Sequence, residues 1–501
     1  MKPIKAVLLS FVLCAAAVAQ TIDAAAIDAA VGQAMKAWQV PGAAVAIVKG
    51  DRVVHMKGYG VRQMGNPVPV TPDTLFAIAS TTKAFTSTAM AMLVDSGKMQ
   101  WDDPVRKYLP YFHLADPLAD ASVTMRDIVS HRTGLSRNDI LWIGSPWSRE
   151  EVIRMIGFVP LTKPFRSAYQ YQNILFTAAG ESVAAASGGT WEAFIQHRIF
   201  DPLGMKGANF RTVDAQSSAD HSAVHQMVKG KLQTGTWSNV DNIGGAGCIN
   251  AGVRDLSQWV RLQVGRGAID GKRLVSEANL LETRTPHTVI RMEAATRALN
   301  PDTEQMTYGM GWTIFDYRGQ SVVGHGGALR GFRSQVVLLP KKDIGFVILS
   351  NLGNTQMPEA LRNTLIDLML DLPAKDWNAL LLAQTKKTEA EEQEKELQRE
   401  AKRHKDTRPS LPLAAYAGSY QNAGYGTAEV IAASDGLLLK WSNFAPKLVH
   451  FHFDTFDVKE AGPLANTVVQ FVLAPNGEVA SLKMLDQEFR KLPVAASGLA
   501  K

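Results

Sequence analysis

Cysteine is nearly absent from this sequence: among 501 residues there are two, Cys14 and Cys248. Cys14 lies in an N-terminal stretch that we expect to be removed, which leaves one cysteine in the mature chain. A single cysteine excludes an internal disulfide, so the stability of the fold must come from a packed core. Cys248 lies in the glycine-rich stretch GGAGCINAG, and we interpret it as a small buried residue rather than a reactive thiol.

Long hydrophobic runs are also scarce. The N-terminal run AVLLSFVLCAAAV is shorter than the roughly 20 residues that a membrane-spanning helix needs. It follows the basic residues Lys2 and Lys5 and leads to the small residues AVA, which end at Ala19. This pattern predicts a signal peptide over residues 1–19 and an exported protein, periplasmic or secreted, without stable membrane insertion. Leu13 stands where a small residue precedes the cysteine of a lipoprotein, so we expect no lipid on Cys14.

The excess of positive charge is small. Lys and Arg number 53 and Asp and Glu number 47, which gives a net charge of +6. Part of this excess lies in the predicted signal peptide, and the remainder is spread along the chain. A dispersed charge favours solubility, and we expect no nucleic-acid partner.

Several motifs of other enzyme classes are missing. The sequence contains no Gly-x-Ser-x-Gly, which excludes the nucleophile elbow of α/β-hydrolases, and no His-Glu-x-x-His. His221 and His225 are four residues apart, and His450, His452 and Asp454 alternate along a β-like run. Neither group completes a recognisable ligand set, so we expect no metal and no other cofactor.

Strand-like segments lie at both ends of the first 375 residues. Residues 43–60 predict two strands joined by a turn, and four more strands are expected between residues 310 and 351. Residues 101–261 are predicted to be mostly helical, with breaks at Pro and Gly turns. This order indicates an α/β (α+β) protein with one sheet assembled from both ends, an inserted helical lobe and a ligand cleft between them.

The composition changes in the last quarter of the chain. Residues 384–408 mix both charges with few apolar residues, and Glu391 and Lys395 are spaced for an i, i+4 pair. This favours a solvated helical linker. Short β-like runs follow and predict a small all-β barrel. We assign residues 22–375 to a main domain, 376–410 to the linker and 411–495 to the barrel.

Ser80 and Lys83 lie at the start of a nearly all-apolar helix predicted over residues 77–94. Their spacing places both side chains on one face of the helix. A serine hydroxyl needs a base to become a good nucleophile, and a lysine with a desolvated ammonium group can serve as that base. The alternative, a surface lysine on a half-buried helix, fits poorly because the helix is apolar nearly all round.

A tyrosine motif, Tyr171-x-Asn173, occurs in the stretch YQYQN. A tyrosine near a lysine can share its proton and act as a general base, and the asparagine can bind the lysine or a substrate amide. The same pattern recurs at Tyr420 in the predicted barrel, but without a serine–lysine pair in that domain. We therefore interpret Tyr420 as structural.

A third motif, His325-Gly326-Gly327, ends a predicted strand in the stretch GHGGALRGFRS. The glycines allow a substrate to approach the backbone closely and leave amides free for an oxyanion hole. A lone histidine is often a satisfied core residue, but glycines beside it favour an exposed strand edge.

Together these motifs, in this order, resemble the serine β-lactamase and penicillin-binding-protein superfamily. The sequence is most similar to the branch with class C β-lactamases, D-Ala-D-Ala carboxypeptidases, D-aminopeptidases and β-lactamase-like esterases. The stretches VPGAAVAIVKG, LFAIASTTKAFT, SHRTGL, IFDPLGM and GHGGALRGF strengthen the resemblance, which covers about residues 27–354. It implies an antiparallel sheet flanked by helices plus an all-helical lobe. The C-terminal part resembles the small β-barrel often appended to such hydrolases.

By this resemblance Ser80 is the acylated nucleophile, Lys83 is its activating partner, and Tyr171 is the general base and leaving-group acid. Asn173 would contact Lys83 and substrate. The backbone amides of Ser80 and Ala328 would form the oxyanion hole.

Two positions depart from the family pattern. His325 replaces the lysine of the family's Lys-Thr-Gly, and Gly326, followed by Gly327, lacks the hydroxyl that helps to hold a substrate carboxylate in many relatives. A histidine is not permanently charged, so we expect weak carboxylate recognition and activity that changes near the ordinary histidine pKa. Arg330 or Arg333 is an alternative source of positive charge.

The sequence thus predicts an exported serine hydrolase acting on amide or ester bonds of small D-amino-acid-type peptides or esters. Hydrolysis of β-lactams is the first alternative. A non-catalytic scaffold with the same fold is the second. The natural substrate, the oligomeric state and the role of the C-terminal domain are left open.

Overall fold

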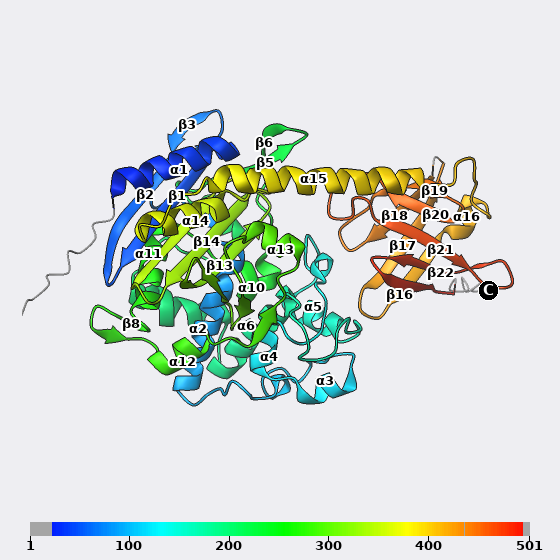
Figure 1. Ribbon diagram of the computed structural model, residues 1–501. Coiled ribbons are helices and arrows are strands. Elements are labelled where there is room, and N and C mark those ends of the chain that lie inside the picture. Colours follow the sequence, from blue (N-terminus) through cyan, green and yellow to red (C-terminus); the bar gives the residue numbers. More distant parts are fainter. Residues whose placement is uncertain (1–22, 435, 494–501) are drawn as a thin grey trace, which may run out of the picture.

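A nine-stranded antiparallel sheet forms the centre of the larger domain (Figure 1). The computed structural model describes residues 23–434 and 436–493, so the predicted signal peptide lies outside the described residues. Strands from both ends of the domain lie side by side, because β1 pairs with β15. In sheet order the strands are β10 (Thr288–Ile290), β11 (Met306–Tyr308), β12 (Thr313–Tyr317), β13 (Gln320–Leu329), β14 (Phe332–Leu339), β15 (Ile344–Ser350), β1 (Gly42–Lys49), β2 (Arg52–Gln63) and β3 (Asn66–Pro69).

Helices cover both faces of the sheet, as predicted. Side chains of β1 alternate between two hydrophobic clusters, because successive residues of a strand point to opposite faces. Ala43, Val45 and Ile47 pack with α1 (Ala24–Trp38) and α14 (Met357–Met369). Ala44, Ala46 and Val48 face the cluster that contains α2 (Thr82–Asp95) and α11 (Val253–Val264). The core therefore lies on both sides of the sheet.

The helical lobe is inserted between β3 and the later strands. Its elements are η2 (Val105–Lys107), α3 (Pro117–Ser122), α4 (Met125–Val129), η3 (Asp139–Leu141), α5 (Arg149–Ile156), α6 (Asn173–Ser187), α7 (Trp191–Ile195), η4 (Gln196–Phe200), α8 (Asp201–Leu203), α9 (Thr212–Ser217), η5 (Asp241–Ile243) and α10 (Gly244–Gly247). A hairpin of β5 (Val224–Val228) and β6 (Lys231–Gly235) lies in the stretch expected to be mostly helical. Smaller elements are β4 (Phe76–Ala77), β7 (Asn250–Ala251), β8 (Ala268–Ile269), β9 (Lys272–Arg273), α12 (Glu277–Glu282) and α13 (Ala294–Leu299).

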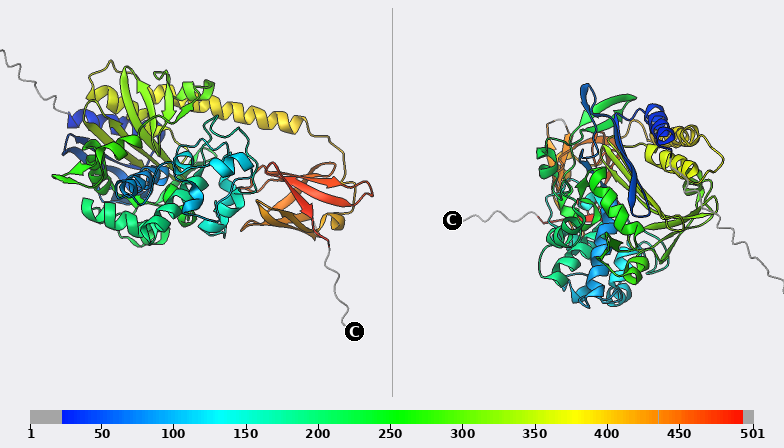
Figure 2. Two further views of the ribbon diagram at one scale, coloured as in Figure 1. Left: turned by 90° about the horizontal axis from the view of Figure 1, so that it is seen from below. Right: turned by 90° about the vertical axis from the view of Figure 1, so that its left-hand side faces the viewer.

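A long helix, α15 (Trp377–Ala401), joins the larger domain to a C-terminal barrel (Figure 1). Figure 2 shows α15 running along one side of the molecule, after which the chain turns back into the barrel beside the helical lobe. After α16 (Leu413–Tyr416), eight strands close the barrel: β16 (Gly418–Asn422), β17 (Gly426–Ala433), β18 (Gly436–Trp441), β19 (Lys447–His452), β20 (Thr455–Val458), β21 (Val468–Leu473), β22 (Val479–Met484) and β23 (Gln487–Lys491).

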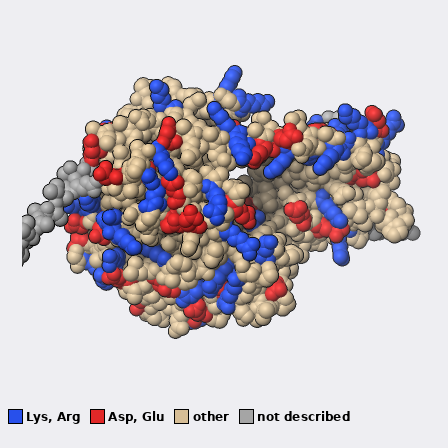
Figure 3. Space-filling view, viewed as in Figure 1, with Lys and Arg blue, Asp and Glu red and all other residues tan. Residues whose placement is uncertain are grey.

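The surface carries both charges. On the face drawn in Figure 3, Lys and Arg side chains are interspersed with Asp and Glu side chains over the larger domain, the linker helix and the barrel. None of the described helices combines the length and the apolar character that are needed to span a bilayer.

Candidate active site

Ser80 lies in a strained turn that leads directly into a helix. It belongs to η1 (Ala79–Thr81), which continues into α2. Ala79 has a φ of 50°, in the left-handed region that costs a residue with a Cβ roughly 1–2 kcal/mol. The turn leaves Ser80 half-buried, whereas its neighbours on both sides are buried. The only half-exposed hydroxyl of this turn therefore belongs to the predicted nucleophile.

Lys83 is fully buried one helical turn after Ser80. Its Nζ lies 3.1 Å from Ser80 Oγ, and it donates to Asn173 Oδ1 at 2.7 Å and to the carbonyl oxygen of Ala246 at 2.9 Å. All three of these partners are uncharged. Burial is the largest influence on the ammonium group and holds the pKa of Lys83 well below its ordinary value, with Asp139 acting in the opposite direction.

Tyr171 lies just before α6, with its ring against the lysine. Lys83 Nζ is 4.8 Å from the ring centroid. Burial raises the pKa of Tyr171 above its ordinary value, although a hydrogen bond with Ser80 and the charge of Arg137 act to lower it. The two pKa shifts favour an uncharged amine beside an uncharged phenol, because separation of charge in a dry site is unfavourable.

A short segment that the sequence did not single out holds the asparagine. Asn173 Nδ2 donates to Asp139 Oδ1 at 2.8 Å, and Asp139 is paired with Arg137. The guanidinium carbon of Arg137 lies 5.1 Å from the ring centroid of Tyr171. The positive charge beside the tyrosine is thus shared with a carboxylate.

His131 is a second residue that the motifs missed, although it belongs to the stretch SHRTGL. Its carbonyl oxygen accepts the N–H of Gln170 at 2.8 Å, and its Nδ1 accepts the N–H of Gln172 at 3.2 Å. These two bonds flank Tyr171 on either side. The ring of His131 also packs against that of Tyr171, with centroids 4.3 Å apart. His131 therefore fixes the backbone that presents the tyrosine.

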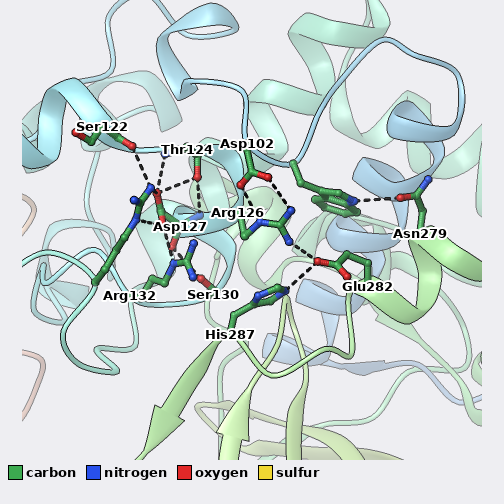
Figure 4. A network of polar contacts seen from close by, with 12 residues as sticks. Asp102, Ser122, Thr124, Arg126, Asp127, Ser130, Arg132, Asn279, Glu282 and His287 are labelled. Atoms are coloured by element: carbon green, nitrogen blue, oxygen red, sulfur yellow. Dashed lines mark hydrogen bonds and ion pairs between the residues drawn. The ribbon is translucent and has the colours of Figure 1, made fainter.

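A network of charged residues anchors the segment that contains His131 (Figure 4). Buried Asp127 accepts from Arg132 at 2.6 Å, and Arg126 links Asp102 to Glu282. The network ties residues 126–132 to the C-terminal end of α12, from which the chain leads to β10. Charged hydrogen bonds of this kind are among the stronger ones in proteins, so the segment has a defined position.

His325 is buried at the end of the site rather than exposed as predicted. Its Nδ1 donates to the carbonyl oxygen of Gly326 at 2.6 Å, so its Nε2 carries no proton and accepts from the hydroxyl of Tyr308 at 3.0 Å. Burial is the main cause that lowers the pKa of His325 to about 3. A histidine with so low a pKa is neutral at neutral pH, so this residue gives no reason for activity to change near the ordinary histidine pKa.

Strand β13 has a free edge next to the nucleophile. Its pairing with β12 runs from Gln320 to Gly324, so His325–Leu329 pairs with β14 alone. Ser334 Oγ donates to the carbonyl oxygen of Ile78 at 2.7 Å, and a Cβ on Gly327 would lie 2.2 Å from that same oxygen. Gly327 is thus required for close packing of the sheet against the turn that contains the nucleophile.

The remaining residues of this strand lie around that edge. Gly326 is half-buried and Ala328 is exposed. The side chain of Arg330 donates to Gln226 at 2.9 Å, and that of Arg333 donates to carbonyl oxygens of its own hairpin. Both arginines therefore have partners within the protein.

The histidines considered as metal ligands bond to backbone groups instead. Both ring nitrogens of buried His225 bond to backbone atoms, as does Nδ1 of His221. His450 contacts a backbone carbonyl oxygen in the barrel. Within the described ranges, no group of three or more His, Cys, Asp or Glu side chains is arranged to hold a metal ion.

Two interpretations from the sequence agree with the structure. Cys248 is buried, and burial raises the pKa of its thiol. Tyr420 is buried in the barrel, and its hydroxyl donates to the carbonyl oxygen of Tyr416 at 2.6 Å.

Comparisons with known proteins identify a matching family for each of the two parts of the chain. The Beta-lactamase family matches residues 27–371, and a domain of unknown function (DUF3471) matches residues 402–495. Unguisins hydrolase ungD from Aspergillus violaceofuscus is 30% identical over 493 residues, which cover 89% of this chain and 85% of that protein.

Solved structures share the fold. The octameric penicillin-binding protein homologue from Pyrococcus abyssi superposes with a TM-score of 0.63 at 21% identity, covering 93% of this chain and 99% of that one. The D-amino acid amidase from Ochrobactrum anthropi SV3 superposes with a TM-score of 0.57 at 21% identity, covering 69% of this chain and 97% of that one. With an extensive family match, an antiparallel sheet flanked by helices and a C-terminal barrel, this chain belongs to the beta-lactamase family of serine hydrolases.

Proposed function

We propose that this protein cleaves amide or ester bonds of small D-amino-acid-type peptides or esters through an acyl-enzyme on Ser80. The observation that carries the proposal is the environment of Lys83, whose Nζ is fully buried and contacts three uncharged groups. A buried ammonium without a carboxylate partner is costly, so a lysine retained there favours a catalytic role over a scaffold.

The proton route follows from the opposed pKa shifts. Uncharged Lys83, rather than Tyr171 as the family resemblance implies, accepts the proton of Ser80 as Oγ attacks the substrate carbonyl carbon and forms the tetrahedral oxyanion. The oxyanion is stabilised by the backbone amides of Ser80 and Ala328. The phenol of Tyr171 protonates the leaving amine or alkoxide as its bond to carbon breaks, and the proton on Lys83 restores the phenol. Water then cleaves the acyl ester and regenerates Ser80.

The substrate class is proposed from what faces the nucleophile. His325 is neutral and Gly326 has no hydroxyl, so this strand edge offers little to a substrate carboxylate. An amide or ester without a free carboxylate at that position suits the site better than a penicillin does. The relative named as an unguisins hydrolase supports a hydrolytic activity, and the D-amino acid amidase with the same fold favours an amide as the bond cleaved.

The first test is covalent labelling of Ser80. The mature protein is incubated with a fluorophosphonate and, separately, with a penicillin, and the intact mass is measured. We expect a fluorophosphonate adduct that is lost in Ser80→Ala and retained in Ser87→Ala, a matched change of a serine in α2, the helix that follows the turn of Ser80. No adduct in the wild type, or one that persists in Ser80→Ala, contradicts the proposal. A Ser80 adduct with penicillin as well would show a cleft that accepts β-lactams, and release of the hydrolysed penicillin would point instead to the β-lactam alternative.

We also propose that the protein is exported after cleavage following Ala19, on the strength of the three-part N-terminal pattern. Mass spectrometry of the N-terminal peptide from a secreting host tests this, and a peptide that retains Lys2 and Lys5 contradicts it.

A further inference from the structure

Gln172 lies between the two residues of the tyrosine motif and is fully buried. Its side-chain oxygen accepts the N–H of Ile174 at 2.9 Å and so caps the start of α6. Its side-chain Nε2 donates to the carbonyl oxygen of Ser136 at 2.7 Å and to Asn138 Oδ1 at 3.3 Å. Gln172 therefore connects the segment that contains Tyr171 and Asn173 to residues 136–138.

The opposite end of the Asn138 amide reaches the C-terminal barrel. Asn138 Nδ2 donates to the hydroxyl of Tyr425 at 2.8 Å. Both side chains are buried, with 7% of Asn138 and 2% of Tyr425 exposed. A buried chain of hydrogen bonds thus runs from the barrel through Asn138 to Gln172. Because the chain is buried, water competes little for these bonds.

The barrel holds Tyr425 rigidly. The residue lies in the turn between β16 and β17, and its ring stacks on Trp441, with centroids 6.1 Å apart. The indole N–H of Trp441 donates to the carbonyl oxygen of Tyr425 at 2.8 Å. Trp441 also packs edge-on against Trp147 of the helical lobe, and Asn443 donates to the carbonyl oxygen of Gly144 at 3.1 Å. The interface is therefore fixed on both sides of the tyrosine.

The chain neighbours of Asn138 reach the catalytic groups themselves. Arg137 lies over the ring of Tyr171, and Asp139 accepts from Asn173, which in turn binds Lys83. A displacement of Asn138 would therefore move groups on both sides of the proton route. Displacements of about 1 Å can change catalytic rates by about 100-fold.

We infer that Tyr425 of the C-terminal barrel is a positioning residue for the active site. Through Asn138 and Gln172 its hydroxyl fixes the segment that presents Tyr171 and Asn173, so the barrel completes the catalytic domain instead of merely accompanying it. The inference rests on the proposed function, because it assigns the barrel a role in the reaction of Ser80.

Tyr425→Phe in the full chain tests the inference, since it removes the hydroxyl and keeps the ring. Tyr420→Phe is the matched control: both tyrosines are buried in the barrel, but the hydroxyl of Tyr420 bonds within the barrel. Two properties are measured, the rate at which a fluorophosphonate labels Ser80 and the hydrogen exchange of residues 170–174.

For Tyr425→Phe we expect the maximum labelling rate to fall about tenfold, with the half-saturating probe concentration changed less than about twofold. Exchange at residues 170–174 should be faster than in the wild type. Tyr420→Phe should match the wild type in both properties, although it loses a hydrogen bond of the same kind. In an Asn138→Leu background, Tyr425→Phe should have no additional effect, because both changes interrupt the same chain of bonds.

Three results would overturn the inference: Tyr425→Phe behaving as Tyr420→Phe does, an unchanged labelling rate despite faster exchange, or additive effects of Tyr425→Phe and Asn138→Leu. A wild type that shows no Ser80 labelling would refute the proposed function. In that event, the exchange of residues 170–174 still decides whether the barrel fixes the segment.

Discussion

At the scale of single residues, the burial of His325 makes a prediction about stability and pH. The pKa of this imidazole is about 3 in the folded chain, lowered chiefly by burial from an ordinary value of 6.5. Between these values the unfolded chain binds one proton more than the folded chain does at this site. The free energy of unfolding therefore decreases as the pH falls, by about 1.4 kcal/mol per pH unit from this residue.

His325→Gln should remove that contribution, because glutamine does not titrate. The difference in the free energy of unfolding between variant and wild type should shift in favour of the variant as the pH falls from 7 to 4. Urea unfolding at several pH values measures the shift, and the same substitution at exposed His197 serves as the control. A constant difference across this range would show that His325 is not held neutral by the fold.

Motif spacing identified the residues that touch Lys83 through their own side chains, but not those that act through the backbone. Ser80 and Asn173 could be predicted because a serine–lysine spacing and a tyrosine–asparagine motif together indicate one kind of active site. His131 could not be assigned, because it holds Gln170 and Gln172 through its carbonyl oxygen and one ring nitrogen. Such contacts depend on tertiary placement, which spacing along the chain does not encode.

At the scale of elements, the packing of β13 against η1 predicts different effects for two adjacent glycines. A Cβ on Gly327 would lie 2.2 Å from both the carbonyl oxygen of Ile78 and Ser334 Oγ. A Cβ on Gly326 would approach Gln335 Nε2 at 2.9 Å, which is the end of a long side chain rather than backbone. Gly327→Ala should therefore destabilise the protein by about 1–3 kcal/mol and displace Ser80, whereas Gly326→Ala should be milder.

Thermal unfolding and the rate of Ser80 labelling measure the two variants side by side. Gly327→Ala should lower both properties more than Gly326→Ala does. Equal effects, or a greater effect at Gly326, would refute the packing explanation.

The sequence pattern predicted the central strands but not the short elements at their edges. Alternation and buried apolar runs identify β1 and β13–β15, where the core selects the residues. The strands β10 and β11 have three residues each, and the hairpin of β5 and β6 has an exposed tip, so neither shows a clear period. His225 belongs to β5, although its distance of four residues from His221 is also about one turn of a helix.

At the scale of the whole molecule, two separate connections hold the barrel. One is the interface with the helical lobe around Tyr425 and Trp441. The other is α15, whose C-terminal end binds the barrel through Arg399, paired with buried Asp457 at 2.6 Å. Between its two ends α15 is largely exposed, and Glu391 makes only a surface pair with Lys387 at 4.0 Å. If the interface positions the active site, continuity of the exposed helix should matter little for catalysis.

Glu391→Pro tests this separation of roles. Proline costs a helix interior about 3 kcal/mol, so α15 should break locally and become sensitive to protease near residue 391. The rate of Ser80 labelling should stay within about twofold of that of Glu391→Ala, which removes the same side chain and its surface pair without interrupting the helix. Limited proteolysis and labelling of both variants measure the two effects. A loss of rate as large as that expected for Tyr425→Phe would mean that an intact α15 holds the barrel in place, and that the interface alone is too weak to keep the active site in order.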